Sequence, residues 1–230
     1  MRTAYVSCFH GRHRVSEVFL AHCADIGIIG DVFAAVTRGD TANLALLQRY
    51  GVHFVEADNE PLGAKHNAAL RLALSSTIGF THFMVLPSDD LVSSEWANKC
   101  SAYTYATVPS CAIVEPVTGR AKLLHGSVGG RMKFGACRVF AREVVEGLGG
   151  KLWEDRRVKA LDSCSDGRVR AAGYSMQMAD VKGPAFVDIK TPESLWDYDT
   201  WTGDGLTMDA ALWMCGDKVT ASVRCLSTHA

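Results

Sequence analysis

Residues 61–67 read Pro-Leu-Gly-Ala-Lys-His-Asn, and residues 82–90 read His-Phe-Met-Val-Leu-Pro-Ser-Asp-Asp. In the first stretch, a Pro-Leu-Gly turn leads into a helix that we predict over residues 64–74. The second stretch is an apolar strand followed by two adjacent acids, Asp89 and Asp90. An α/β sheet places its ligand chemistry at the carboxyl ends of its strands, and two acids there can hold a divalent metal. Together the two stretches predict an α/β fold with a ligand site at this edge.

The rest of the first half alternates in the same way. Apolar patterns predict strands over residues 3–9, 31–37, 52–57 and 82–86, with helices between them, including one over residues 41–50 that Gly51 ends. Strands separated by single helices predict a mixed, mostly parallel sheet flanked by helices, that is, a Rossmann-like α/β class.

The second half is less regular. We predict helices over residues 96–106, 141–147 and 153–161, and strands over residues 111–116, around Arg138, and over residues 175–181 and 185–188. Beyond residue 191 a tail contains Trp196, Trp201 and Trp213, which we interpret as packing residues. One domain over residues 1–230 is expected.

Composition excludes few function classes. The chain has 230 residues, a formal net charge of −1 and a pI of about 6.7, so nothing draws it as a whole to nucleic acid or membrane. Its eight cysteines form no Cys-x-x-Cys pair, which indicates reduced thiols. No apolar segment approaches the roughly 20 residues of a membrane span, and no secretory leader is recognisable. We therefore expect a soluble protein without a membrane partner, located in the cytoplasm.

Several of these motifs resemble those of the GT-A fold of nucleotide-sugar-dependent glycosyltransferases, especially small phage and bacterial members of its large inverting family. The matching segments are the first strand with Arg12 and Arg14 after it, residues 61–67, residues 86–90, Phe-Gly-Ala-Cys-Arg at 134–138, and residues 152–162. The resemblance covers about residues 3–188. It departs from the family pattern at Pro87, where many members have the first aspartate of an Asp-x-Asp signature.

The resemblance implies a GT-A-like fold and a metal-dependent sugar transfer. Residues 1–95 would bind the nucleotide sugar, with a UDP-sugar favoured, residues 96–190 would form the acceptor side, and residues 191–230 a tail. Charge develops on the leaving diphosphate, and Mn²⁺ or Mg²⁺ stabilises it. Asp90 is the implied metal ligand, and Asp89 would contact the metal or the donor. The alternative is that residues 88–90 only cap the next helix.

Four further residues are implied in nucleotide binding. Lys65 lies in the first turn of its helix, where a cation opposes the helix dipole and needs another reason to be present. The motif implies that Lys65 and Asn67 face the nucleotide. Asp40, in the loop after the second strand, is implied to meet the base or ribose, with Asp58 as the competing candidate. Arg12 is a further nucleotide contact.

Inverting transfer needs a general base, and a carboxylate is usual in this fold. Asp162 matches the acid that follows the Leu-Trp segment in the similar phage proteins, whereas Glu154 and Asp155 resemble the Glu-Asp pair of other members. We favour Asp162, because the charged run at residues 154–157 is typical of a solvated helix start. Gly135 would let the backbone approach the sugar or acceptor closely.

The basic residues of the second half bear on the identity of the acceptor. Six basic residues and no acid occur between residues 118 and 142: Arg120, Lys122, Arg131, Lys133, Arg138 and Arg142. A basic acceptor face suits a polyanion such as DNA. Since the similar proteins are often phage-encoded, a hydroxymethylated pyrimidine of phage DNA is one candidate, and the host cytoplasm would then be the location. A saccharide or small-molecule hydroxyl is the other.

Two other classes stay open. A sugar nucleotidyltransferase shares the fold but carries a glycine-rich phosphate loop after the first strand, where this chain has only Gly11 between residues 7 and 12. A non-catalytic nucleotide-sugar-binding protein is favoured by Pro87.

Overall fold

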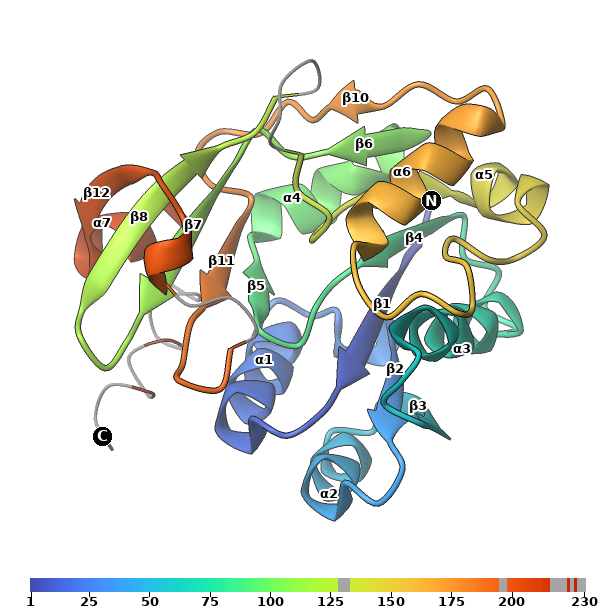
Figure 1. Ribbon diagram of the computed structural model, residues 1–230, viewed down its shortest axis with the longest axis horizontal. Coiled ribbons are helices and arrows are strands. Elements are labelled where there is room, and N and C mark those ends of the chain that lie inside the picture. The colour runs from blue at the N-terminus through green and yellow to red at the C-terminus, as the bar shows by residue number, and fades with distance from the viewer. Residues whose placement is uncertain (128–132, 195–197, 216–222, 224–225, 227–230) are drawn as a thin grey trace.

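The computed structural model describes residues 1–127, 133–194, 198–215, 223 and 226, and their strands form two sheets (Figure 1). The larger sheet has the order β10-β6-β9-β4-β1-β2-β3, and the smaller has the order β12-β8-β7-β11-β5. The larger sheet contains β1 (Thr3–Phe9), β2 (Val32–Thr37), β3 (His53–Ala57), β4 (His82–Val85), β6 (Tyr105–Thr107), β9 (Val139–Ala141) and β10 (Gln177–Met178). The smaller contains β5 (Asp90–Val92), β7 (Ser110–Glu115), β8 (Arg120–His125), β11 (Phe186–Ile189) and β12 (Asp204–Thr207).

The larger sheet confirms the predicted fold class. Its four parallel pairs are β1 with β2, β1 with β4, β2 with β3, and β6 with β10, whereas β9 runs antiparallel to both β4 and β6. The carboxyl ends of β1, β2 and β4 therefore meet at one edge. The second sheet was not predicted from the sequence.

Helices cover both faces of the larger sheet. They are α1 (His13–Asp25), α2 (Thr41–Arg49), α3 (Leu62–Leu74), α4 (Ser94–Lys99), α5 (Arg142–Gly147) and α6 (Leu161–Ala171), whereas α7 (Met208–Cys215) packs on the smaller sheet. Along β1, Tyr5 packs in one apolar cluster with α1 and the smaller sheet, whereas Val6 packs in a second cluster with α3, α5 and α6. Successive side chains of a strand point to opposite faces, so β1 is buried on both sides.

No helix of the described residues is long and apolar enough to cross a membrane.

Two predicted helices are wrong: one is shorter than predicted, and the other does not form. The helix expected over residues 96–106 ends at Lys99, is followed by a 3-10 turn, Cys100–Ala102, and gives way to β6. The helix expected over residues 153–161 does not form, and α6 begins only at Leu161. The backbone of residues 153–157 is instead bonded to α3, a tertiary contact that overrides the local helical pattern. Trp213 lies within α7, and Trp196 falls outside the described residues.

The first turn of α3 is the surface on which that segment lies. The backbone N–H of Gly63 donates to the carbonyl of Arg157 at 2.8 Å, and that of Ala64 donates to the carbonyl of Asp155 at 3.1 Å. These are N–H groups that an α-helix leaves without an internal partner. A Cβ at Gly63 would lie 3.1 Å from the carbonyl carbon of Glu154 and closer still to its oxygen. Glycine at position 63 is therefore required by close backbone packing.

This packing predicts opposite effects at two helical glycines. Gly63→Ala should lower the free energy of unfolding by about 1–3 kcal/mol, because the new methyl group collides with backbone. Gly167 is an exposed residue of α6 with open space around its Cβ position. Gly167→Ala should therefore raise the free energy of unfolding by about 0.4–1 kcal/mol, because alanine reduces the conformational entropy of the unfolded chain. Urea unfolding of both variants measures this difference, and equal behaviour of the two would contradict the packing described above.

Candidate functional site

Charged side chains gather where β4 passes into β5. Arg12 Nη1 contacts Asp89 Oδ2 at 2.9 Å, and its Nη2 donates to the carbonyl of Ile189 at 3.2 Å. Arg12 thereby joins the end of β1 to the end of β11. The structure thus brings together Arg12, Asp89 and Asp90, three of the residues singled out in the sequence.

Asp90 and Asp188 form the buried centre of this group. They are opposite one another in the antiparallel pair of β5 and β11, so their side chains share a face. Asp90 is 4% exposed, and one carboxylate oxygen of each residue is shut off from solvent and has no hydrogen-bond partner in the described part of the chain. Burial, together with the neighbouring charges of Asp188 and Asp89, raises the pKa of Asp90 well above its usual value. A proton or a cation would satisfy the two oxygens.

Lys190 supplies part of the compensating charge. Its Nζ lies 2.7 Å from Asp188 Oδ2, and its side chain is 7% exposed. Burial raises the pKa of Asp188 to about 6, although the charge of Lys190 opposes the shift. Neither residue was selected from the sequence. The available signal was the spacing, because residues 188 and 190 lie on one face of a strand whose other neighbours are apolar.

The capping alternative for residues 88–90 is wrong. The helix that follows is α4, and its N-cap is Ser93, whose hydroxyl accepts from the backbone N–H of Trp96 at 3.2 Å. Asp90 instead begins β5. The two acids are therefore not the cap of α4.

Asp40 lies at the same edge, as the N-cap of α2. Its carboxylate accepts from the backbone N–H of Gly11 at 2.8 Å, from Asn43 Nδ2 at 2.8 Å and from the backbone N–H of Asn43 at 3.2 Å, and lies 2.9 Å from His13 Nε2. Burial opposes ionisation, but these hydrogen bonds outweigh it and hold the pKa at about 2. The carboxylate is thus occupied by protein donors. Asp58, its competitor, is 80% exposed and pairs with Arg38.

Lys65 bonds to residues at the ends of β1 and β2. Its Nζ donates to the carbonyl of Phe9 at 2.8 Å, to Thr37 Oγ1 at 2.6 Å and to Asn59 Oδ1 at 3.0 Å. An ammonium group has three donors, and all three are used. Lys65 is 2% exposed, and burial lowers its pKa. It joins β1, β2 and the loop before α3.

Asn67 is equally enclosed. Its Nδ2 donates to the carbonyl of Trp153 and to Asp155 Oδ1, both at 2.8 Å, and its Oδ1 accepts from the N–H of Trp153 at 3.3 Å. The side chain therefore holds the segment before α6, and Asp155 is one of its partners. Glu154 forms an ion pair with Arg157 at 3.2 Å.

Asp162 differs from those two acids. Its side chain is exposed, yet the surrounding protein raises the pKa of its carboxyl group, an effect that Arg138 opposes. Arg138 is 1% exposed and donates to the carbonyls of Asp162 and Phe134, both at 3.0 Å. This clamp sets the Asp162 carboxylate against Gly135, where any Cβ would overlap it. The structure thus presents an exposed Asp162 carboxylate beside Gly135.

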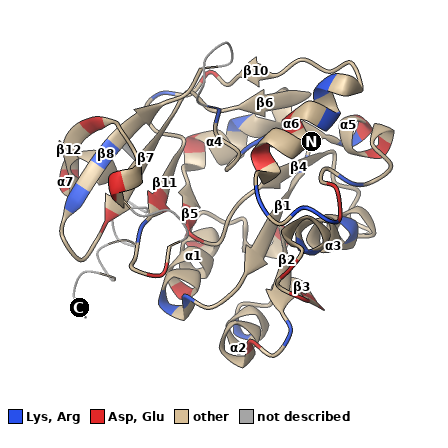
Figure 2. Cartoon of the chain, viewed as in Figure 1, with Lys and Arg blue, Asp and Glu red and all other residues tan. Residues whose placement is uncertain are grey.

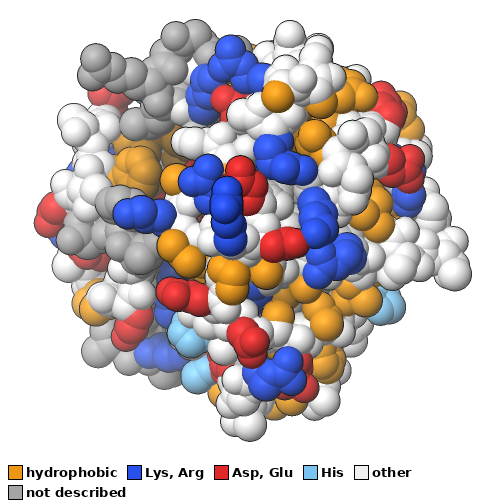
Figure 3. Space-filling model, turned by 45° about the vertical axis from the view of Figure 1, so that its right-hand side comes forward, with side chains coloured by type: hydrophobic (Ala, Val, Ile, Leu, Met, Phe, Trp, Pro, Cys, Tyr) orange, Lys and Arg blue, Asp and Glu red, His pale blue; other side chains and the backbone are white. Residues whose placement is uncertain are grey.

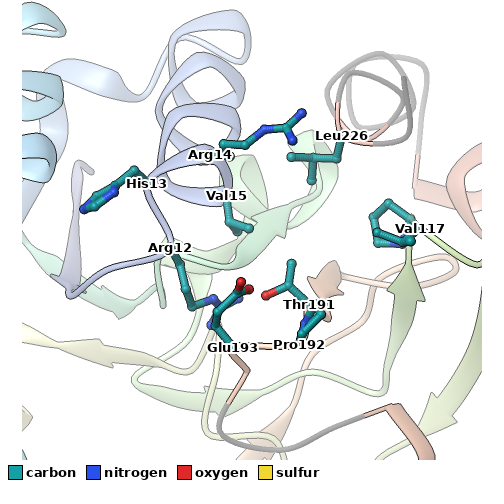
Figure 4. A pocket seen from close by; sticks show the side chains of 10 residues that line it. Arg12, His13, Arg14, Val15, Val117, Thr191, Pro192, Glu193 and Leu226 are labelled. Carbon is teal, nitrogen blue, oxygen red and sulfur yellow. The ribbon is translucent and has the colours of Figure 1, made fainter. Parts of the chain in front are cut away.

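Two cavities adjoin the charged group. One of about 200 Å³ is lined by both Asp162 and Asp188, and also by Lys190. Another, of about 420 Å³, lies between the start of α1, the turn of β7 and β8, and the residues after β11. Figure 4 shows Arg12, Thr191 and Glu193 facing it. Arg12 therefore borders both the acidic group and the larger cavity.

The predicted basic acceptor face is largely neutralised. Arg120 pairs with Glu115 and Asp199, Lys133 with Asp166, and Arg142 with Glu146. Lys122 donates to the carbonyls of Tyr198 and Trp201, and Arg138 is buried; Arg131 lies outside the described residues. Figure 2 shows acidic residues interspersed with basic ones along the chain, and Figure 3 shows red and blue side chains adjoining on one face.

The described residues contain no group of three or more His, Cys, Asp or Glu placed to hold a metal. Asp90 and Asp188 nevertheless fit a hard cation that also takes phosphate oxygens, because Mg²⁺ is commonly held by one or two carboxylates plus substrate phosphates. Their partnerless oxygens are the observation that supports this fit.

Comparison with solved structures gives distant likenesses. The inositol-1-phosphate CTP transferase from T. maritima aligns over 84% of this chain and 90% of its own, with a TM-score of 0.53 and 11% sequence identity. CMP:2-keto-3-deoxy-manno-octonic acid synthetase complexed with CTP gives a TM-score of 0.49 at 12% identity, covering 87% and 95% of the two chains. The catalytic domain of Drosophila β1,4-galactosyltransferase 7 in complex with xylobiose gives 0.47 at 13%, covering 88% and 74%.

No protein-family model matches the sequence, and no curated protein matches it. The likeness to the CTP transferase supports the α/β fold that the strand order defines, and at this identity it shows the fold alone.

The bonds of Asp40 predict an acid-sensitive cap. Its pKa of about 2 lies below the unfolded value of about 3.9, so its contribution to stability is complete above the unfolded value and is lost as pH falls through about 2. Asp40→Ala should lower the free energy of unfolding by about 0.5–2 kcal/mol near neutral pH. Asp40→Asn should keep most of the cap.

Unfolding curves between pH 5 and pH 2 measure this: the stability gap between the wild type and Asp40→Asn should shift against the wild type as pH falls. If the difference in free energy of unfolding does not change with pH, these contacts do not lower the pKa of Asp40 in the folded protein.

Proposed function

We propose that the protein is a metal-dependent glycosyltransferase that moves a sugar from a nucleoside diphosphate sugar, with a UDP-sugar favoured, to a hydroxyl acceptor. The observation that carries the proposal is the cavity shared by Asp162 and Asp188. Its lining combines the exposed Asp162 with Asp188, which is paired across β11 and β5 with the buried Asp90. Asp90 follows the carboxyl end of β4, and an α/β sheet commonly binds its ligand at the carboxyl ends of its strands.

The acidic pair supports the donor half of the reaction. Asp90 and Asp188 would hold Mn²⁺ or Mg²⁺, which supplies positive charge for the leaving diphosphate. Arg12 lies beside them and borders the cavity of about 420 Å³, which falls within the usual range of ligand pockets, about 300–1,000 Å³. Asp89 keeps Arg12 in place through their ion pair.

Lys65, Asn67 and Asp40 support the donor site indirectly in this proposal. Their polar groups are bonded to the protein, so they fix the strand ends, the segment before α6 and the loop after β1. Direct contact of any of them with a nucleotide requires exchange of one of these bonds.

Asp162 supports the acceptor half. In a single inverting displacement, the acceptor oxygen bonds to the anomeric carbon while the bond from that carbon to the diphosphate oxygen breaks. The proton of the acceptor hydroxyl goes to Asp162. The raised pKa of Asp162 makes it a stronger base than an ordinary aspartate, and its exposed side chain can meet an acceptor. Asp155 and Glu154 are engaged in other bonds.

The acceptor is proposed only as a hydroxyl group. A hydroxymethylated pyrimidine of DNA remains one candidate, and the exposed Arg156, whose side chain is 91% exposed, is a basic group near α6 that would suit phosphate. The ion pairs of the 115–142 region favour a saccharide or small-molecule hydroxyl.

A nucleotidyltransferase is the second candidate, favoured by the fold shared with the CTP transferase. The two reactions differ in products. Sugar transfer releases a nucleoside diphosphate, whereas nucleotidyl transfer consumes a nucleoside triphosphate and a sugar phosphate and releases pyrophosphate. Product analysis with each substrate set separates them, and the absence of turnover with both would leave a binding protein.

The first binding experiment is a thermal-shift panel of nucleoside diphosphates and UDP- or GDP-sugars, with and without Mn²⁺. A ligand that binds only the folded state raises the apparent stability. We expect one nucleotide to raise the melting temperature in a manganese-dependent manner. If none of these ligands raises it, the protein has no nucleotide-sugar donor site.

Asp90→Ala should abolish the manganese-dependent part of nucleotide binding, because a buried ligand oxygen is lost. Calorimetric titration of nucleotide with and without Mn²⁺ measures it. Glu17→Ala, at an exposed acid of α1 that pairs with Arg49, serves as the matched control and should bind as the wild type does. Unchanged manganese dependence in Asp90→Ala would rule out this metal site.

Asp162→Ala should retain nucleotide binding and lose transfer by about 10²–10⁴-fold, the usual contribution of a general base. Gly135→Ala should have a similar effect on turnover, since its methyl group displaces the carboxylate without removing it. The acid limb of kcat/KM should lie above the ordinary pKa of aspartate. Full turnover in Asp162→Ala would show that another group is the base.

A further inference from the structure

The cavity of about 200 Å³ is lined by both apolar and charged side chains. Its lining includes Lys133, Phe134, Asp162, Asp188, Lys190 and Trp201. They come from the smaller sheet and the residue after β11, the segment before β9, the start of α6 and the segment after the last 3-10 turn, Tyr198–Thr200. Asp162 and Asp188 belong to the site already described. Trp201 has no part in it and was interpreted from the sequence as a packing residue.

Trp201 carries an unexplained donor. Its Nε1–H is shut off from solvent and has no hydrogen-bond partner among the residues that the structure describes, although buried polar groups in folded proteins are paired as a rule. Its position is fixed, because its carbonyl accepts from Lys122 Nζ at 2.8 Å. Lys190 Nζ lies 6.0 Å from the centre of its ring. A ligand oxygen in the adjoining cavity would remove the cost of the unpaired N–H.

Both lysines that line the cavity form ion pairs with carboxylates. Lys190 pairs with Asp188, and Lys133 lies 3.3 Å from Asp166 Oδ2. A ligand that needs a large excess of either charge is therefore disfavoured. Hydroxyl groups can bond to such paired carboxylates and ammonium groups, since carboxylates accept and ammonium groups donate.

Size and surface narrow the ligand further. The volume is below the roughly 300–1,000 Å³ of pockets for drug-sized ligands, which suits a single small ring. The indole ring and the other apolar side chains of the lining offer a surface for the C–H face of a small ligand ring. The charged side chains of the lining can bond to the hydroxyl groups of that ligand. These are the properties of an uncharged monosaccharide unit.

We propose that Trp201, together with Lys190, forms a subsite for one uncharged saccharide ring beside Asp162. The proposal rests on the proposed glycosyltransferase function and deepens it. Two sources share this ligand chemistry, namely the sugar of the donor and a sugar unit of the acceptor. In both cases Trp201 positions the ring, and Asp162 remains the residue that takes the proton.

The test compares three variants. Trp201→Phe keeps an aromatic ring and removes the N–H, and Trp201→Leu removes both. Trp96→Phe is the matched control, because it makes the same change at a tryptophan that does not line the cavity and whose Nε1 donates to the carbonyl of Cys137 at 2.8 Å. Thermal melting verifies that each variant is folded.

Binding is measured by calorimetry and ligand-observed NMR with three probes: UDP and GDP, the corresponding nucleotide sugars, and methyl glycosides with or without bound nucleotide. Trp201→Phe should weaken saccharide binding about three- to tenfold, as expected for one lost hydrogen bond, and Trp201→Leu should weaken it further. Affinity for the nucleotides without sugar should not change. Trp96→Phe should bind every probe as the wild type does.

The arms identify the source. If Trp201 matters only for the gain of a nucleotide sugar over its nucleotide, the ring is that of the donor. If it matters for methyl glycosides on the nucleotide-loaded protein, the ring belongs to the acceptor. Either result supports the subsite.

The failures are also distinct. If no nucleotide binds but methyl glycosides bind in a Trp201-dependent manner, the subsite stands and the glycosyltransferase proposal falls. If nucleotide sugars bind and both Trp201 variants bind all probes unchanged, the subsite is overturned and the donor site stands. Absence of any saccharide-dependent binding overturns the subsite regardless of nucleotide.

Discussion

The first turn of α3 receives the backbone of residues 153–157, and much of the candidate site depends on that contact. The N–H groups of Gly63 and Ala64 and the side chain of Asn67 meet the segment directly. The segment leads into α6, so the contact helps to fix the first turn of that helix, where Asp162 lies. A residue with a side chain at position 63 would separate the two. One absent side chain thus brings together parts of the chain that are distant in sequence.

Buried charge is the second constraint. Taking an ion out of water is expensive unless hydrogen bonds or an opposite charge replace the lost solvation. Lys65 meets this condition with three oxygen acceptors and strengthens the edge where β1 and β2 end. Asp90 and Asp188 meet it only in part, because each retains a buried oxygen that has no hydrogen-bond partner among the described residues. Complete bonding is typical of a structural role, and incomplete bonding points to a ligand.

Much of the fold could be predicted because its signal is local. The apolar run of β1, the end of α2 before Gly51 and the turn before α3 are each encoded within a few residues. The segment at 153–160 was misinterpreted because its charge pattern resembles a helix start, whereas its backbone bonds are made to α3. β8 was missed because its partners, β7 and β12, are needed to recognise it.

The candidate site divides in the same way. The sequence by itself determined that Arg12, Asp89 and Asp90 follow strands, and strand ends of one parallel sheet must meet at an edge. Only the tertiary structure decided that Asp188 lies opposite Asp90, since strand pairing brings them together. It also decided that Lys65 and Asn67 bond to the protein while Asp162 is exposed. A residue type specifies what a side chain can bond to, and the folded chain specifies which of those partners are within reach.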